Sequence, residues 1–167
     1  MLDHHEVAYV LVGGVAAGLY GAVRLTEDFD CVASRTRENL RRLGAAMSEL
    51  RARLRVEGLS DAEAAALPIR LEPEVFASME LSTWRTDAGD LDVLAGLPAI
   101  DGRLRPYDAL VQQATNIRVA GVVVHVAGLD DIINSKRWAN RPKDLDAIPE
   151  LEALVREQIE GPERPGP

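Results

Sequence analysis

The segment YVLVGGVAAGLYGAVRLTEDFDCV, residues 9–32, contains two apolar runs separated by a pair of glycines and ends with two aspartates that lie two residues apart. The apolar run before the glycines predicts a strand that ends at Gly13–Gly14, and the run after them predicts a short helix. Residues 28–33 alternate acidic and apolar side chains, as a strand with one polar face does. A strand, a glycine pair, a helix and an acidic strand in this order decide the expected fold.

The aspartates predict a cation site. Because residues i and i+2 of a strand face the same way, Asp28 and Asp30 are expected to project together. Two like charges at this spacing repel, and carboxylate oxygens are ligands that suit Mg²⁺ or Mn²⁺. The segment GDLDVL offers a third carboxylate, Asp92, with Asp90 as the alternative two residues earlier. Three carboxylates on adjacent strands can hold two ions about 4 Å apart, which is the geometry used in phosphoryl transfer.

The glycine pair adds a phosphate-binding element. Glycines that lead into a helix let the backbone approach a phosphate, and the first turn of the helix supplies unpaired N–H donors. Taken alone, the acidic pair also fits exposed aspartates on a half-solvated strand. The combination of the glycines, the pattern Arg24-x-Thr26-x-Asp28-x-Asp30 and Asp92 on a later strand favours a metal–phosphate site.

Two motifs carry a resemblance to a known family. The stretch GGVAAGLYGAVRLTEDFD resembles the first motif of the nucleotidyltransferase superfamily, which has the polymerase-beta-like fold. Its finer pattern is similar to that of the AbiEii-type branch, which includes toxins of toxin–antitoxin systems. LDDIINSKRWANRPKDLDAI, residues 129–148, resembles the family's C-terminal basic helix. The resemblance covers most of residues 7–150 and implies an α+β (α/β) fold, with a mixed twisted sheet flanked by helices and a C-terminal helical segment.

The resemblance also implies roles for individual residues. Gly13 and Gly14 would hold the triphosphate of a nucleotide, and Lys136 would reach its phosphates as a point charge. The three aspartates named above would bind Mg²⁺ or Mn²⁺ and carry the catalysis, the third as metal ligand or as general base. Arg24 and Thr26 precede the metal-binding strand and would support the site or contact phosphate.

A basic run near the C-terminus is the best local footprint for a polyanion in an otherwise acidic chain. Its four positive charges are Lys136, Arg137, Arg141 and Lys143. The alternative is a solvated helix face whose cations pair with Asp144 and Asp146. Trp138 lies inside the run and could stack on a base, although packing at the rim of the core is the other interpretation.

The remaining patterns predict the other elements. Five residues at steps of three and four predict a helix that Ser34 or Thr36 caps: Leu40, Leu43, Met47, Leu50 and Leu54. Residues 75–86 and 90–95 predict two strands, and residues 117–127 predict a hairpin that turns at Ala120–Gly121. Two helices, separated at the sequence NRP, are expected within residues 129–160.

Length, net charge and cysteine content limit the kinds of protein that this sequence can encode. The 167 residues predict one domain, residues 1–160, followed by a disordered tail at residues 161–167. The net charge of −8 argues against general electrostatic binding to nucleic acid. No apolar run reaches the roughly 18–20 residues that span a bilayer, and no signal peptide is recognised. A single cysteine, Cys31, fits a reducing cytoplasm, whereas the oligomeric state is undetermined by these patterns.

The sequence thus predicts a Mg²⁺-dependent nucleotidyltransferase that moves a nucleoside monophosphate from an NTP to a hydroxyl and releases pyrophosphate. The AbiEii-type resemblance favours an RNA acceptor such as tRNA, with the protein acting as a toxin that has a cognate antitoxin. A small-molecule acceptor, as in antibiotic-modifying relatives, is the enzymatic alternative. A non-catalytic nucleotide-binding or interaction module with the same fold is the alternative from a different class.

Overall fold

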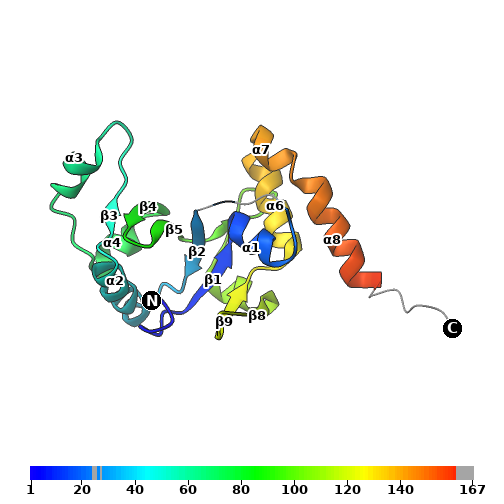
Figure 1. Cartoon of the computed structure of the whole chain (residues 1–167), viewed down its shortest axis with the longest axis horizontal. Helices are drawn as coiled ribbons and strands as arrows, with labels where there is room; N and C mark the ends of the chain where they lie inside the picture. Colours follow the sequence, from blue (N-terminus) through cyan, green and yellow to red (C-terminus); the bar gives the residue numbers. More distant parts are fainter. Residues whose placement is uncertain (24–25, 27, 161–167) are drawn as a thin grey trace.

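The structure is a computed structural model that describes residues 1–23, 26 and 28–160. Its strands are β1 (Tyr9–Val12), β2 (Phe29–Ala33), β3 (Arg53–Leu54), β4 (Leu81–Thr86), β5 (Gly89–Leu94), β6 (Leu97–Pro98), β7 (Leu104–Arg105), β8 (Thr115–Val119) and β9 (Val122–Val126). Its helices are α1 (Gly13–Leu19), α2 (Arg37–Glu49), α3 (Asp61–Ala65), α4 (Pro73–Ser78), α5 (Tyr107–Leu110), the 3₁₀ turn η1 (Val111–Gln113), α6 (Leu129–Ala139), α7 (Pro142–Leu145) and α8 (Ile148–Glu160) (Figure 1).

A seven-stranded mixed sheet organises these elements, in the order β3-β4-β5-β2-β1-β9-β8. β1 runs antiparallel to β2, with Leu11 opposite Cys31, whereas β2 runs parallel to β5 and β1 runs parallel to β9. The parallel pairing of β2 and β5 places Asp30 opposite Asp92. The predicted α+β fold with a mixed sheet and flanking helices is confirmed.

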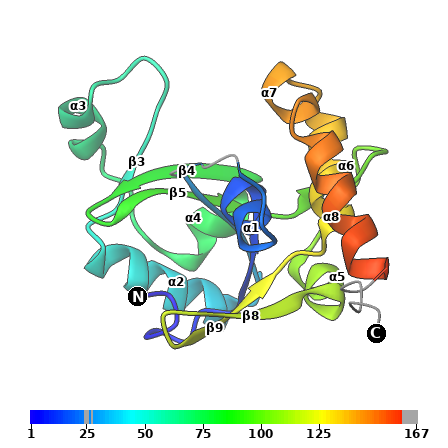
Figure 2. The same cartoon turned by 45° about the vertical axis from the view of Figure 1, so that its right-hand side comes forward.

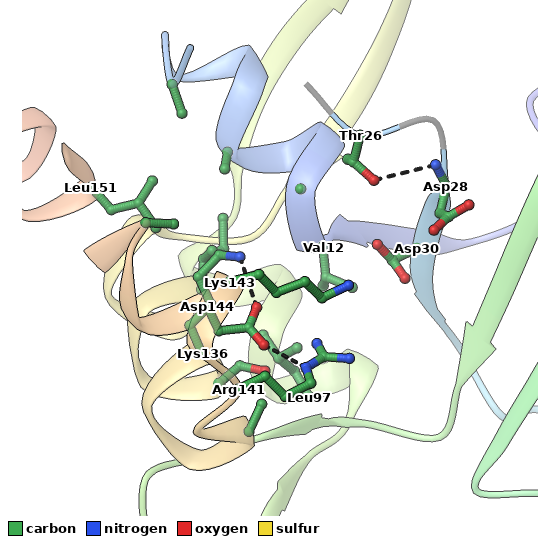
Figure 3. A pocket seen from close by; sticks show the side chains of 18 of the residues that line it. Val12, Thr26, Asp28, Asp30, Leu97, Lys136, Arg141, Lys143, Asp144 and Leu151 are labelled. Carbon is green, nitrogen blue, oxygen red and sulfur yellow. Dashed lines mark hydrogen bonds and ion pairs between the residues drawn. The ribbon is translucent and has the colours of Figure 1, made fainter. Parts of the chain in front are cut away.

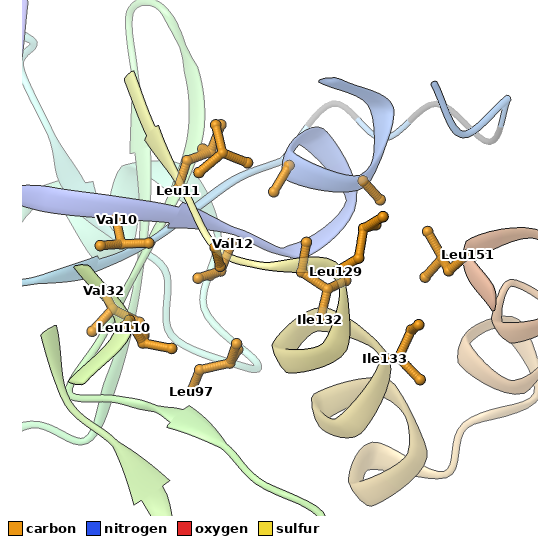
Figure 4. Packing of buried hydrophobic residues seen from close by; sticks show 14 of the residues in the cluster. Val10, Leu11, Val12, Val32, Leu97, Leu110, Leu129, Ile132, Ile133 and Leu151 are labelled. Atoms are coloured by element: carbon orange, nitrogen blue, oxygen red, sulfur yellow. The ribbon is translucent and has the colours of Figure 1, made fainter. Parts of the chain in front are cut away.

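Helices cover the two faces of the sheet at different places. On one face, β1 and β9 pack against α1, α6 and α8 through an apolar cluster that includes Val12, Ile132 and Leu151 (Figure 4). On the other face, α2 and α4 pack on the strands through a second cluster that includes Leu43 and Trp84. The first layer of helices stands over one end of the sheet only, and α7 and the α3 segment rise from opposite ends on the same side (Figures 1 and 2). The polar face of β4 and β5 therefore lies between these two projections.

Two sequence predictions in the first half of the chain need correction. The strand predicted for residues 75–86 begins only at Leu81, because Pro73 at the first helical position starts α4 instead and buries Phe76. The helix predicted to run through Leu54 ends at Glu49. The chain turns at Arg51, which has φ 50°, and continues into β3.

Two other predictions of elements are confirmed, and one more needs correction. The Thr36 hydroxyl accepts a hydrogen bond from the backbone N–H of Asn39 and caps α2. The hairpin of β8 and β9 turns at Ala120–Gly121, where both residues have positive φ. The C-terminal segment contains three helices rather than two, because Pro142 begins the short α7.

Within the described residues, no helix has the length and apolar character needed to cross a membrane. Arg24 and the tail at residues 161–167 lie outside the described residues, so their predicted roles have no structural counterpart here. Cys31 is a buried free thiol, as its place on the apolar face of β2 predicts.

Candidate active site

The start of α1 accepts only very small residues. Gly13 has φ 69°, and a Cβ at this position would lie 2.1 Å from Oδ2 of Asp30. A Cβ on Gly14 would lie 2.2 Å from Cγ2 of Thr26. The two glycines therefore allow the backbone of α1 to lie directly against the side chains that lead into and occupy β2. Thr26 in turn accepts a hydrogen bond from the backbone N–H of Asp28 at 3.4 Å.

The three predicted carboxylates come together on one side of the sheet. Asp30 and Asp92 are paired in the register of β2 and β5, and Asp28 is an exposed residue directly before β2. All three line a cavity of about 340 Å³ with Gly13 and Gly14 (Figure 3). The residues that sequence reasoning placed on separate strands and at the glycine turn thus share one space.

The electrostatics of this space favour a cation. Burial, together with the charges of Asp92 and Asp28, raises the pKa of Asp30 to about 6, although the Gly14 N–H and Lys136 act in the opposite direction. Burial also raises the pKa of Asp92. Carboxyl groups that resist ionisation in this way gain most from a positive ion placed between them.

The donor chemistry fits a hard divalent ion, because every candidate ligand is a carboxylate oxygen. Within the described part of the chain, however, no group of three or more acidic, histidine or cysteine side chains is arranged to hold one ion in the present side-chain positions. The three aspartates border the cavity instead of converging on a point.

Basic residues form the wall opposite the aspartates (Figure 3). Lys136 of α6 donates to Oδ1 of Asp144 at 3.2 Å, and Nε of Arg141 donates to Oδ2 at 2.5 Å. Burial alone would raise the pKa of Asp144, but these hydrogen bonds hold it below its ordinary value. Asp144 is buried and therefore fixes both cations at the cavity, whose lining also includes Lys143.

Two residues of the basic run lie elsewhere. Arg137 is absent from the described lining of the cavity and donates to Glu152 of α8 at 2.5 Å. Trp138 is also absent from that lining and is 51 % exposed beside Gly102, at which a Cβ would lie 2.9 Å from the indole Nε1. α6 therefore presents Lys136 to the cavity and directs the next two side chains away from it.

Asp90 and Asp92 have different surroundings, although they lie on the same face of β5. Asp90 accepts hydrogen bonds from Arg55 at 2.9 Å and from Nε of Arg85 at 3.1 Å, and the Arg85 hydrogen bond lowers its pKa. Asp92 lines the cavity, and the pKa of its carboxyl is raised by burial, with the neighbouring Thr83 hydroxyl acting in the opposite direction. The geometry therefore favours Asp92 as the third carboxylate of the site.

Sequence reasoning missed other residues of the lining, among them Ser135 and Glu150. Glu150 of α8 accepts a hydrogen bond from the backbone N–H of Val23 at 2.7 Å and so connects the C-terminal helix to the loop after α1. No local sequence pattern predicts that these two residues line the cavity. Only the packing of α8 beside α6 and α1 brings Glu150 to the cavity.

Comparisons with known proteins identify the fold. No protein-family model matches the chain, and no curated protein is significantly similar to it. Among solved structures, the chain is similar to the lincosamide antibiotic adenylyltransferase LnuA with lincomycin bound, at 11 % identity and a TM-score of 0.57, over 92 % of this chain and 90 % of that one. It is similar to ANT(2'')-Ia in complex with adenylyl-2''-tobramycin, at 18 % identity and a TM-score of 0.55, over 95 % and 86 %. The chain therefore has the fold of nucleotidyltransferases, whereas the AbiEii-type branch stays a prediction.

Proposed function

We propose that this protein is a metal-dependent nucleotidyltransferase, which transfers a nucleoside monophosphate from an NTP to a hydroxyl and releases pyrophosphate. The observation that carries the proposal is the shared cavity of Asp28, Asp30 and Asp92. The glycine-bordered start of α1 and Lys136 contribute to the same cavity. Oxygen ligands on one wall and cations on the other are what a metal–triphosphate complex requires.

In this reaction the acidic wall and the basic wall of the cavity have different roles. The acceptor oxygen forms a bond to the α-phosphorus while the bond from that phosphorus to the bridging oxygen breaks, and pyrophosphate leaves with the electron pair. Lys136 and Arg141 neutralise the phosphates. Asp28 and Asp30 would hold the metal. Asp92 supplies the third carboxylate, as a further ligand or as the base that takes the proton of the acceptor.

Mg²⁺ is the ion that we assign to the carboxylates, with Mn²⁺ as a substitute. A bound divalent ion would neutralise charge that develops on the phosphates and align the attacking and leaving oxygens. The raised pKa of Asp30 supports this assignment, since a buried carboxylate beside two others is costly without a cation. The backbone at Gly13 and Gly14 would receive the phosphates close to that ion.

The acceptor is a further part of the proposal. The two antibiotic-modifying enzymes of the same fold support a small molecule, and the chain spans nearly their whole length. The resemblance in the sequence supports tRNA, and with it a toxin that is held by an antitoxin. Both acceptors use the same reaction at phosphorus, so one assay can compare them.

The test is transfer of label from each of four α-³²P-labelled NTPs in Mg²⁺, in separate reactions with lincomycin, tobramycin and total tRNA. The double variant Asp28→Ala/Asp30→Ala is the control, and we expect label to move only with the intact protein. Growth arrest on expression that Asp28→Ala relieves would favour the toxin. Absence of NTP binding by the intact protein would refute the catalytic proposal and leave a non-catalytic module with this fold.

A further inference from the structure

A second cavity, of about 530 Å³, lies beside the candidate active site. It lies between the chain after β3 and the polar face of β4 and is lined by Arg55, Val56, Glu57, Gly58, Leu59, Ala64, Thr83 and Arg85. The α3 segment rises above this end of the sheet, on the side to which α7 projects at the other end (Figure 2). We call this second cavity the arginine cavity.

The arginine cavity borders the third carboxylate directly. Thr83 of β4 lines this cavity, and its cross-strand neighbour Asp92 of β5 lines the first one. Pairing across the strands continues this row, since Thr83 is opposite Asp92 and Asp92 is opposite Asp30. On the other side of Thr83, the backbone N–H of Arg55 donates to the Thr83 carbonyl at 2.8 Å. One row therefore runs from Arg55 to the metal-binding aspartates.

The guanidinium groups are held in place and still reach solvent. Arg55 and Arg85 are 45 % and 41 % exposed, and both donate to the carboxylate of Asp90. Among the described residues that line the arginine cavity, Glu57 is the one acidic side chain.

We infer that the arginine cavity is the acceptor subsite and that the acceptor bears a phosphate group near its reactive hydroxyl. This inference rests on the proposed function, because it places the acceptor beside the same carboxylates. A guanidinium forms paired hydrogen bonds to phosphate. Asp90 holds Arg55 through Nη1 and Arg85 through Nε and Nη2, so Arg55 is the residue for the paired contact and Arg85 adds positive charge. An acceptor with several positive charges would be repelled by the same two groups. The phosphate can belong to an RNA strand or to a small phosphorylated molecule.

The test measures binding of two probes to the full chain without NTP. The probes are a fluorescein-labelled single-stranded RNA with a free 3′ hydroxyl, followed by anisotropy, and glucose 6-phosphate, followed by calorimetry. Arg55→Gln is the test variant, and Arg55→Lys keeps the charge but loses the paired geometry. Arg41→Gln is the matched control, since Arg41 is an exposed residue of α2 paired with Glu38, outside both cavities.

We expect at least one probe to bind and Arg55→Gln to weaken it about tenfold, with a smaller loss for Arg55→Lys. Arg41→Gln should leave the affinity unchanged. If RNA binds, the slope of the logarithm of its affinity against the logarithm of the salt concentration should decrease in magnitude by about one in Arg55→Gln, because one fewer counterion is released. Binding of glucose 6-phosphate alone would identify a small phosphorylated acceptor.

Binding of Mg²⁺–ATP, measured on the same samples, separates the two proposals. It should be unchanged in Arg55→Gln, which also shows that the variant is folded, and lost in Asp28→Ala/Asp30→Ala. The inference is overturned if neither probe binds, or if Arg55→Gln retains the full affinity for both, while the intact protein binds Mg²⁺–ATP. Loss of Mg²⁺–ATP binding by the intact protein would contradict the proposed function instead.

Discussion

Replacing Asp30 with asparagine is expected to stabilise the metal-free protein while removing its response to divalent ions. Asp30 lies against Gly13, is influenced by the Gly14 N–H and faces Asp92 across β2 and β5. Asparagine has nearly the same shape and can accept the Gly14 hydrogen bond, but it carries no charge. The substitution therefore tests the charge of the side chain with little change in packing.

The magnitude follows from the titration of Asp30. Burial, with the charges of Asp92 and Asp28, raises its pKa from 3.8 to about 6. Each unit corresponds to about 1.4 kcal/mol, so ionisation lowers the free energy of unfolding by at most roughly 3 kcal/mol. Because Asp30 is half-buried and solvent screens part of the effect, we expect about 2 kcal/mol.

The pH dependence has a definite sign. Well below pH 3.8 the carboxyl is protonated in both the folded and the unfolded chain and contributes no difference. Between about pH 4 and pH 6 the unfolded chain ionises first, so the stability of the parent protein falls as the pH rises. The advantage of Asp30→Asn over the parent should grow through this window and stay constant above it.

Thermal unfolding in EDTA at low and at high pH measures this advantage. About 2 kcal/mol corresponds to a rise in Tm of roughly 4–8 °C at pH 8 for a chain of this size. Added Mg²⁺ should raise the Tm of the parent and leave that of the variant unchanged. The matched control is Asp90→Asn, which should destabilise at pH 8 because Arg85 lowers the pKa of Asp90. A metal-free Asp30→Asn protein less stable than the parent at pH 8, or a difference independent of pH, would refute the reasoning.

Three further substitutions test other parts of the structure. Gly13→Ala should lower the free energy of unfolding by about 1–3 kcal/mol and displace the Asp30 carboxylate, so both stability in denaturant and Mg²⁺–ATP binding should decrease. Gly121→Ala is its control, because Gly121 also has positive φ but an added Cβ there meets no atom within 4 Å, so it should cost less and leave binding intact. Lys136→Gln should weaken Mg²⁺–ATP binding about tenfold in calorimetry, whereas equal losses in Arg137→Gln would contradict the assignment of Lys136 to the cavity. Thr36→Ala should lower the free energy of unfolding, measured in denaturant, by about 1 kcal/mol, because it removes the cap of α2. Nucleotide binding should be unchanged.

The sequence predicted the parts of the site that lie on one local element. Residues 9–32 contain the glycine pair and the first two aspartates, and alternation along the strand indicated that Cys31 is buried while Asp30 faces the other way. Hydrophobic period and turn residues also predicted the β8–β9 hairpin correctly. These features depend on neighbours in the sequence, so a local pattern is enough to find them.

The errors arise where tertiary packing overrides a local pattern. The apolar residues of α4 form a pattern that predicts a strand, yet Pro73 and the burial of Phe76 favour a helix. The basic run showed a concentration of positive charge, and only the structure shows that α6 directs Lys136 and Arg137 to different surroundings. The choice between them depends on where α7 and α8 pack, and the run itself carries no sign of that.

The register between β2 and β5 connects the two cavities. Because these strands are parallel and aligned, Asp30 faces Asp92 and the same row continues to Thr83 and Arg55. A shift by one residue would move Asp92 to the apolar face of β5 and bury it against α2. The buried Leu91 and Val93 oppose such a shift, since both would then face the cavity. The apolar residues between the polar ones thus determine which carboxylate reaches the active site and which arginines stand beside it.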